Sequence, residues 1–409
     1  MPVFKYKAFD KAGKAVEGSL EGASHNVVSE NLRRKGLFVG EIHEVKKSIF
    51  TFDLQEFIDN IKPVGQKDKT IFCHQLSTMV GAGLTLTKAL DVLEGQTQNS
   101  KFRKIIGYVR RDVSQGNPLS MALSRFPGTF DRLFISMVHT GEVGGGMADL
   151  LNRWAAFSER DDDLRSRMKA ALTYPVVVLT ISMAAVFFLI TFVLPTFTEI
   201  FHNAGVTLPL PTMILDEVSK LIRKRAVFLV AGVIGLVVAF KQFKNSKKGR
   251  FTLDKLKLKL PIFGNLTYLM IMGRFARVFG ILLASGISVI EALEIVKEVT
   301  NNLVVNRVLD KVDENVKRGG SISKPLADSG VFAPLVTNIL PVGEETGTMD
   351  KLLLKIADFY DRDLENLIRN LSSVLEPVLL VVMGGIVGFI ALSLILPMYD
   401  IIKVVRKGM

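Results

Sequence analysis

The stretch Gly343-Glu344-Glu345-Thr346-Gly347-Thr348-Met349 decides the fold, because a related stretch, Gly141-Glu142-Val143-Gly144-Gly145-Gly146-Met147, occurs earlier in the chain. Each stretch is followed by an amphipathic run, a proline and an apolar segment that ends in Leu-Pro. The prolines are Pro175 and Pro195 after the first stretch, and Pro377 and Pro397 after the second. All of these positions are displaced by 202 residues between the two occurrences. A constant displacement indicates a tandem duplication.

The duplication extends toward the N-terminus with a displacement of 203 residues. The repeated positions are Phe72, Leu76, Val80, Gly83, Leu86, Ala89 and Leu90 in the first copy and Phe275, Phe279, Leu283, Gly286, Val289, Ala292 and Leu293 in the second. Apolar residues at helical spacing, interrupted by Gly and Pro, predict an antiparallel bundle of about six helices in each copy. The bundles are expected over 67–170 and 262–375, each with a last helix that continues into the membrane.

Three apolar segments are expected to cross the membrane. Residues 170–198 and 377–399 contain no charged residue, and each exceeds the roughly 20 residues that span a hydrocarbon core. The uncharged run 226–240 is shorter, but flanking Arg and Lys side chains can reach the membrane surfaces. The predicted transmembrane helices are 171–195, 223–243 and 376–398. The short apolar run 278–290 matches the core of the first copy and is assigned to the second bundle.

The first residues predict a small mixed module, 1–47, with a ββαβ order. Residues 3–9 alternate apolar and polar side chains, residues 10–13 supply a turn, and residues 16–20 return as a partner strand. A helix over 24–35 and a third strand over 37–45 complete the module. Residues 48–66 form a linker. The fold class is therefore a mainly α membrane protein with two duplicated bundles, three transmembrane helices and a small N-terminal module.

Both bundles are expected on the same side of the membrane, because the middle span returns the chain after the first. Basic residues before the first span and after the second mark that side as cytoplasmic. The N-terminus is then cytoplasmic, whereas residues 196–222 and the tail 399–409 are periplasmic. Two basic groups fit this topology poorly: Lys220, Arg223, Lys224 and Arg225 beside the second span, and Lys403, Arg406 and Lys407 after the third.

Sequence motifs for catalysis are not found. The chain has no phosphate-binding loop of the G-x-x-x-x-G-K-[ST] type, no H-E-x-x-H and no G-x-S-x-G, and its five histidines form no pair at helical spacing. Its one cysteine, Cys73, excludes an intrachain disulfide. The apolar runs of the three spans, 170–198, 226–240 and 377–399, carry no charged residue, which argues against a transporter or channel. The net charge of +12 is better explained by anionic lipid headgroups than by nucleic acid.

Three sets of residues remain as candidates for function. Glu142, Glu344 and Glu345 are candidate metal ligands, although a carboxylate at a helix corner explains the same pattern without a metal. Small residues on the third span favour close helix packing; they are Gly384, Gly385 and Gly388. Acidic residues on the last helix of each bundle are candidates for a partner interface; they are Asp161, Asp162, Asp163, Asp361, Asp363 and Glu365.

The chain as a whole resembles the PilC/GspF family, the inner-membrane platform proteins of type IV pilus and type II secretion machines. The matching stretches, besides those at 141–147 and 343–349, are Phe4-Lys5-Tyr6-Lys7-Ala8, residues 75–83, Leu208-Pro209-Leu210-Pro211, residues 260–264 and Leu375-Glu376-Pro377. The residues at 330–332 and 342–347 are more similar to the pilus branch of the family. The F-type platform of a secretion system is the alternative.

The resemblance implies a scaffold without catalytic activity or cofactor. It implies contacts with a hexameric cytoplasmic assembly ATPase, with pilin or pseudopilin subunits, with other inner-membrane assembly proteins and with lipids. It also implies a homo-oligomer. Because the chain has no energy source of its own, work is expected to reach it through the cytoplasmic bundles.

Overall fold

The computed structural model describes residues 3–9, 15–21, 28–31, 36–45, 63–203, 208–261 and 263–407. The chain forms two compact units, Met1–Pro63 with Asn99–Lys101, and Val64–Gln98 with Phe102–Met409. In the small unit, β1 (Val3–Phe9), β2 (Ala15–Glu21) and β3 (Phe38–Val45) form an antiparallel sheet in the order β2-β1-β3. The three strands were predicted. Of the predicted helix only residues 28–31 are described, and most of the predicted linker lies outside the described residues.

Each copy of the repeat contains six helices, as the sequence predicted. The first copy comprises α3 (Gln66–Gly81), α4 (Leu86–Gln96), α5 (Ser100–Ser114), α6 (Leu119–Ser124), α7 (Arg132–Gly144) and α8 (Met147–Phe188). The second comprises α13 (Phe263–Ala284), α14 (Val289–Thr300), α15 (Leu303–Lys317), α16 (Ser323–Asp328), α17 (Pro334–Thr346) and α18 (Met349–Lys407). Between them lie η1 (Leu189–Val193), α9 (Leu194–Asn203), α10 (Leu210–Lys224), α11 (Ala226–Asn245) and α12 (Lys247–Lys259).

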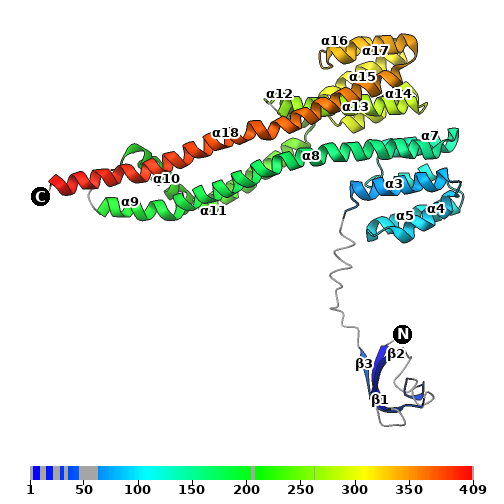
Figure 1. The fold of residues 1–409 in the computed structure, drawn as a ribbon, viewed down its shortest axis with the longest axis horizontal. Helices are drawn as coiled ribbons and strands as arrows, with labels where there is room; N and C mark the ends of the chain where they lie inside the picture. Colours follow the sequence, from blue (N-terminus) through cyan, green and yellow to red (C-terminus); the bar gives the residue numbers. More distant parts are fainter. Residues whose placement is uncertain are drawn as a thin grey trace. The chain divides into compact units, whose positions relative to one another are not determined.

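The two bundles share one continuous apolar core. In the first copy, Phe72 of α3 packs edge-on against Phe102 of α5, and Trp154 of α8 packs against Phe134 of α7. In the second copy, Phe275 of α13 packs edge-on against Phe332, which precedes α17; the corresponding contact in the first copy is that of Phe72 with Phe130. Figure 1 shows the helices of the first copy beside α8 and those of the second beside α18, with the two long helices running next to one another. The helices α8 and α18 are therefore the elements on which both bundles are built.

Both long helices continue beyond their bundles without a break. Pro175 lies inside α8, and Pro377 and Pro397 lie inside α18. In the first copy the helix widens into the single π-helical turn η1, and α9 then continues it to Asn203. Pro195 has no N–H for the carbonyl of residue 191, which lies within this turn, so the π-turn accommodates the missing bond. The Leu-Pro pairs therefore do not end the helices.

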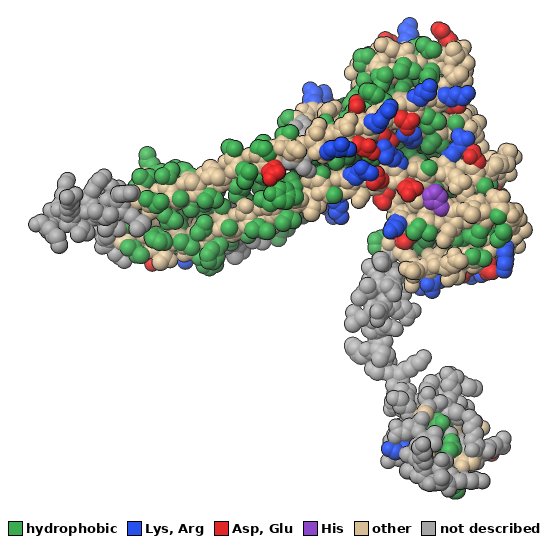
Figure 2. Space-filling view, in the orientation of Figure 1, with side chains coloured by type: hydrophobic (Ala, Val, Ile, Leu, Met, Phe, Trp, Pro, Cys, Tyr) green, Lys and Arg blue, Asp and Glu red, His purple; other side chains and the backbone are tan. Residues whose placement is uncertain are grey.

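The distal parts of α8 and α18 expose apolar side chains, which cover this end of the larger unit in Figure 2. Three helices of the described chain are long and apolar enough to cross a membrane. In the helix that runs from Met147 to His202, none of the most apolar 18-residue stretch is buried. In α18, 11% of the most apolar stretch of that length is buried. The third, α13, has 67% of its most apolar stretch buried, because it packs along α18. This burial, which includes Val278, Phe279 and Leu282, supports the prediction that the apolar run 278–290 belongs to a bundle core.

The helix α11 is longer than the apolar run that predicted it. It has 20 residues, because Lys241 and the residues up to Asn245 stay helical. At 1.5 Å per residue such a helix is about 30 Å long, the thickness of a hydrocarbon core. Its described apolar side chains, such as Phe228 and Leu236, are exposed. Its length thus suits a span, which the shorter run alone did not show.

The helix α10 buries polar side chains and exposes apolar ones. Its buried residues include Thr212 and Ser219, whose hydroxyls donate to the carbonyl oxygens of Ser393 in α18 and Ile190 in η1. Its exposed apolar residues are Leu210, Met213, Ile214, Val218 and Leu221, and its exposed charged residues are Glu217, Lys220, Arg223 and Lys224. Polar groups that are satisfied inward, with apolar groups outward, suit contact with hydrocarbon. The predicted outer segment 196–222 therefore contains a helix that exposes both apolar and charged side chains.

Candidate functional site at the junction of the two copies

Glu142 and Glu344, one from each repeated glycine-rich stretch, accept hydrogen bonds at the start of the shortest helix of each bundle. Both Glu142 carboxylate oxygens accept hydrogen bonds at the start of α6, from the backbone N–H groups of Leu119 and Ser120 and from the Ser120 hydroxyl. In the second copy, Glu344 accepts the same three bonds at the start of α16. A carboxylate satisfies the unpaired N–H groups there and interacts favourably with the helix dipole.

This geometry favours the helix-corner explanation over a metal site. In the described part of the chain, no three His, Cys, Asp or Glu residues are grouped to hold a metal ion. Glu345, the third candidate, is exposed. The oxygens of Glu142 and Glu344 that a metal would need already accept hydrogen bonds.

The glycines of the same stretches permit a sharp corner before each long helix. A Cβ atom on Gly141 would lie 3.0 Å from the Met147 Cα, and one on Gly343 would lie 3.0 Å from the Met349 Cα. Gly146 and Gly347, just before the long helices, adopt φ values of 72° and 65°, which side chains disfavour. The repeated stretch is thus a structural corner that fixes where α8 and α18 begin.

A cluster of ion pairs joins the two copies where α8, α13 and α18 meet. The Arg160 guanidinium of α8 lies 3.3 Å from Asp361 and 2.8 Å from Glu365, both on α18. Asp361 also accepts from Arg277 of α13 at 2.8 Å. Burial disfavours the charged form of the Arg160 guanidinium, but its interactions with the carboxylates of Asp361 and Glu365 outweigh this effect and raise its pKa. Asp361 therefore holds arginines from both copies.

A second, half-buried ion pair crosses the same junction in the other direction. Asp161 of α8 accepts from Arg274 of α13 at 2.7 Å and from Arg165 of its own helix at 2.7 Å. Burial lowers the pKa of the Arg274 guanidinium, and the neighbouring Asp161 carboxylate counteracts that effect. Arginine stays charged at any physiological pH, so the pair is ionic.

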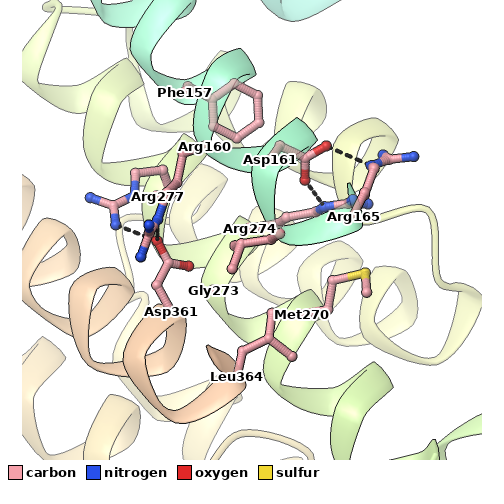
Figure 3. A pocket seen from close by; sticks show the side chains of 11 residues that line it. Phe157, Arg160, Asp161, Arg165, Met270, Gly273, Arg274, Arg277, Asp361 and Leu364 are labelled. Atoms are coloured by element: carbon pink, nitrogen blue, oxygen red, sulfur yellow. Dashed lines mark hydrogen bonds and ion pairs between the residues drawn. The ribbon is translucent and has the colours of Figure 1, made fainter. Parts of the chain in front are cut away.

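Figure 3 shows these side chains around a small cavity between the copies. The cavity measures about 20 Å³, enough for about one water molecule. Phe157, Met270 and Leu364 supply its apolar walls, while the arginines and aspartates supply its polar ones. A cleft of about 570 Å³ adjoins it and is lined by residues of both copies, including Asp162, Arg132 and Glu298. The junction is thus packed at its centre and open beside it.

The structure places the predicted interface acids in three environments. Asp361 is only 6% exposed, so its prediction as an exposed partner contact is wrong; its charge is used inside the junction. Asp161 and Glu365 are half-buried in ion pairs across the junction, and Asp163 pairs with Arg167 on its own helix at 2.8 Å.

Asp162 is exposed at the adjoining cleft, and Asp363 is half-buried. For these two acids a partner contact stays a prediction. The arginines of α13 were missed by the sequence reasoning. The sequence could have indicated them, because Arg274 and Arg277 are the only charged residues of the mainly apolar α13. Their spacing of three positions places them on one face of that helix.

The small residues of α18 make no close helix contact within the described chain. A Cβ atom added at Gly384, Gly385 or Gly388 would meet no other heavy atom within 4 Å. Packing of this stripe against another helix stays a prediction, and its partner would have to come from outside the described residues.

Duplicated helical bundles built on two long, apolar, exposed helices define a helical membrane protein with an internal repeat. Residues 72–195 and 275–397 each match the family described as Type II secretion system (T2SS), protein F. Residues 1–43 match the Type II secretion system protein F, N-terminal domain. The chain belongs to the type II secretion system protein F family. The two matched ranges confirm the duplication.

Relatives of the chain are named for two machines. The chain is 38% identical over 403 residues to the type IV pilus assembly protein PilC of Thermus thermophilus, covering 98% of each chain. It is 33% identical to the PilC of Myxococcus xanthus, covering 97% of this chain and 94% of that one. It is 31% identical to the type II secretion system protein F of Xanthomonas campestris, covering 98% and 99%.

Proposed function

We propose that the chain is an inner-membrane platform of a type IV pilus assembly machine, which couples a cytoplasmic assembly ATPase to pilin subunits. Relatives named for pilus assembly support the machine, since the chain matches one of them at 38% identity over nearly its full length. The fold supports the role of a scaffold. Function as a scaffold needs rigid contacts between the cytoplasmic and membrane parts, and no catalytic group.

The observation that carries the proposal is that each bundle shares one uninterrupted helix with the apolar end of the molecule. The helix α18 runs from Met349 to Lys407, and α8 continues through η1 and α9 to Asn203. A force applied to either bundle reaches the membrane segment along a helix. The ion pairs at Asp361 and Asp161 resist sliding of the two bundles past one another.

The proposed topology places both bundles and the N-terminus in the cytoplasm and the C-terminus in the periplasm. The predicted spans 171–195 and 376–398 are retained, and the span predicted at 223–243 is placed on α11, because residues 223 and 224 belong to α10. The length of α11 supports its role as the returning span. Partners in the membrane are pilin subunits, other assembly proteins and further copies of this chain.

The ATPase contact is proposed at the cleft beside the junction. Asp162 is exposed there, and the cleft is lined by residues from both copies, so a partner bound in it would touch both bundles. The acids at the centre of the junction are excluded from this role because they are already paired.

Deletion of the chain from its host tests the proposed function. The expected result is loss of filaments while pilin subunits still accumulate in the membrane; normal filaments would refute the proposal. A pull-down with the assembly ATPase tests the contact. Asp162→Lys is expected to weaken binding, whereas Glu199→Lys, an exposed acid on α9 at the proposed periplasmic side, is not.

The equivalent platform of a type II secretion system is the second candidate. It is supported by the secretion relative at 31% identity over nearly the whole chain. The deletion strain separates the two: a host that keeps its filaments but loses secretion of folded proteins would assign the chain to secretion.

A further inference from the structure

More than half of the chain's net positive charge lies in one short segment. Residues 241–259 contain eight Lys or Arg residues and one acidic residue, against a net charge of +12 for all 409 residues. The segment comprises the last turn of α11 and the whole of α12. If α11 spans the membrane as proposed, this segment begins at the cytoplasmic surface, where phospholipid headgroups lie.

The segment encloses a cavity of about 400 Å³. Its polar lining includes Lys244 from the end of α11, Arg250 and Lys257 from α12, and Asn301 from the end of α14. The only carboxylate among the lining residues is Asp254, which is 3% exposed and accepts hydrogen bonds from Lys257 and from the backbone of Leu303. Asp254 and Lys257 therefore neutralise one another.

Lys244 and Arg250 keep uncompensated charges. Arg250 donates to the neutral amide oxygen of Asn301, and the described residues place no carboxylate in an ion pair with either side chain. The cavity is thus lined by two cationic side chains whose charges no carboxylate of the described residues balances in an ion pair. Such a site fits a single phosphate group.

The helix α12 is held in place on the second copy. Arg307 of α15 stacks on the Phe251 ring at 3.7 Å, and Asp254 binds the beginning of α15. The opposite side of α12 exposes Leu256 and Leu260 among lysines. Exposed leucines flanked by lysines are typical of a helix that lies in the headgroup layer. A headgroup at this depth therefore meets a cavity that is already formed.

We propose that the cavity between α11 and α12 binds the phosphate of one anionic phospholipid headgroup through Lys244 and Arg250. The site ties the second bundle to the cytoplasmic leaflet, because α12 follows the span α11 in the chain and packs against α15. The inference rests on the membrane span of the proposed function, and it needs neither the ATPase nor the filament.

The test uses the full chain in detergent with phosphatidylglycerol added, and counts retained lipids by native mass spectrometry. Wild type is expected to retain one phosphatidylglycerol with higher affinity than phosphatidylcholine. Lys244→Gln with Arg250→Gln is expected to lose about fivefold in affinity per removed charge. Lys255→Gln with Lys259→Gln removes the same charge from α12 outside the cavity and is the matched control.

The single variant Lys244→Gln removes no side-chain hydrogen bond or ion pair of the described residues, so a loss of lipid binding there is expected without a loss of stability. Protection of buried Cys73 from thiol reagents checks the fold of each variant. Equal losses in the two double variants, or none in either, would overturn the site. Displacement of the lipid by millimolar inorganic phosphate would instead assign the cavity to free phosphate. Filament assembly is scored separately, so a failed lipid site leaves the proposed function standing.

Discussion

Replacement of Asp361 by Asn tests whether the two copies are mechanically joined by their ion pairs. Asp361 binds Arg277 at 2.8 Å and Arg160 at 3.3 Å, and its side chain is 9% exposed. Removing one partner of a fully buried ion pair costs about 3–5 kcal/mol. Asn keeps one oxygen acceptor, and Arg160 keeps Glu365, so we expect a smaller loss of about 2–3 kcal/mol.

Asp358→Asn is the matched control. Asp358 accepts from the same guanidinium nitrogen of Arg277 at 2.7 Å, but its side chain is 60% exposed. An exposed ion pair contributes under about 1 kcal/mol. The two variants thus remove the same charge from the same arginine at nearly the same distance, and only burial and the link to the first copy differ.

The chain carries its own reporters of unfolding, and both lie in the first copy. Cys73 is the only cysteine and Trp154 the only tryptophan, and the structure buries both side chains. Thermal unfolding in detergent is followed by thiol labelling and by fluorescence at one scan rate. At about 2–4 °C per kcal/mol, Asp361→Asn is expected to lower both midpoints by roughly 4–12 °C, and Asp358→Asn by less than about 4 °C.

The reporters and the substitution lie in different copies, which makes the result decisive. Unchanged midpoints for Asp361→Asn would show that the first copy unfolds independently of the junction. Equal shifts in the two variants would show that burial of Asp361 contributes nothing. Either outcome would refute the idea that the junction transmits load between the bundles.

Three further changes test the corners and the core. Glu344→Gln is expected to lower the free energy of unfolding by about 1–2 kcal/mol, because it weakens three hydrogen bonds at the start of α16. Glu345→Gln, at an exposed position, is expected to lower it by less than about 0.5 kcal/mol. The thermal midpoint measures both changes. Gly343→Ala places a Cβ atom 3.0 Å from the backbone of α18 and is expected to cost about 1–3 kcal/mol, whereas Gly384→Ala meets nothing within 4 Å and is expected to be neutral or stabilising. Burial raises the pKa of the Cys73 thiol, so the folded state keeps a proton that the unfolded state releases above about pH 8.5. Stability is therefore expected to fall as the pH rises above that value, and the fall should be smaller in Cys73→Ala when unfolding is measured from pH 8 to 10.

The repeat and the helices could be predicted from the sequence because both depend on local spacing. Apolar residues every three or four positions predicted the bundles, and Gly with Pro marked their corners. Helix ends were less well predicted. Pro195 and Pro397 were expected to end apolar segments, yet both lie inside continuous helices, one of them after a π-turn. A proline weakens a helix locally, and packing can compensate.

The charged junction could not be predicted because it depends on contacts between residues that are 84, 113 and 201 positions apart. Charged residues in an amphipathic helix are usually solvated, which is why Asp361 was expected on the outer face. The structure buries it instead because the second copy packs α13, with Arg277, against α18. A sequence alone gives the helix on which a charge lies, but not which neighbouring helix covers it.

Comparison of equivalent positions shows how the duplication produced an asymmetric junction. Arg277 and Asp361 of the second copy correspond to His74 and Glu159 of the first by the repeat displacements. The first-copy pair is 3.6 Å apart and its two side chains are 46% and 70% exposed. Only the second copy therefore supplies a buried acid for Arg160 to reach.

The contacts of Arg160 with Asp361 and of Arg274 with Asp161 are not repeated with the two copies exchanged, as a twofold arrangement would require. The counterpart of Arg160 is Arg362, whose guanidinium donates to the carbonyl of Asp358 on its own helix. The counterpart of Arg274, which binds Asp161, is the apolar Ile71. In a twofold contact each residue pair would occur twice with the partners exchanged. The two copies thus have similar folds but unequal roles, so a load on one bundle reaches its long helix through different contacts from a load on the other.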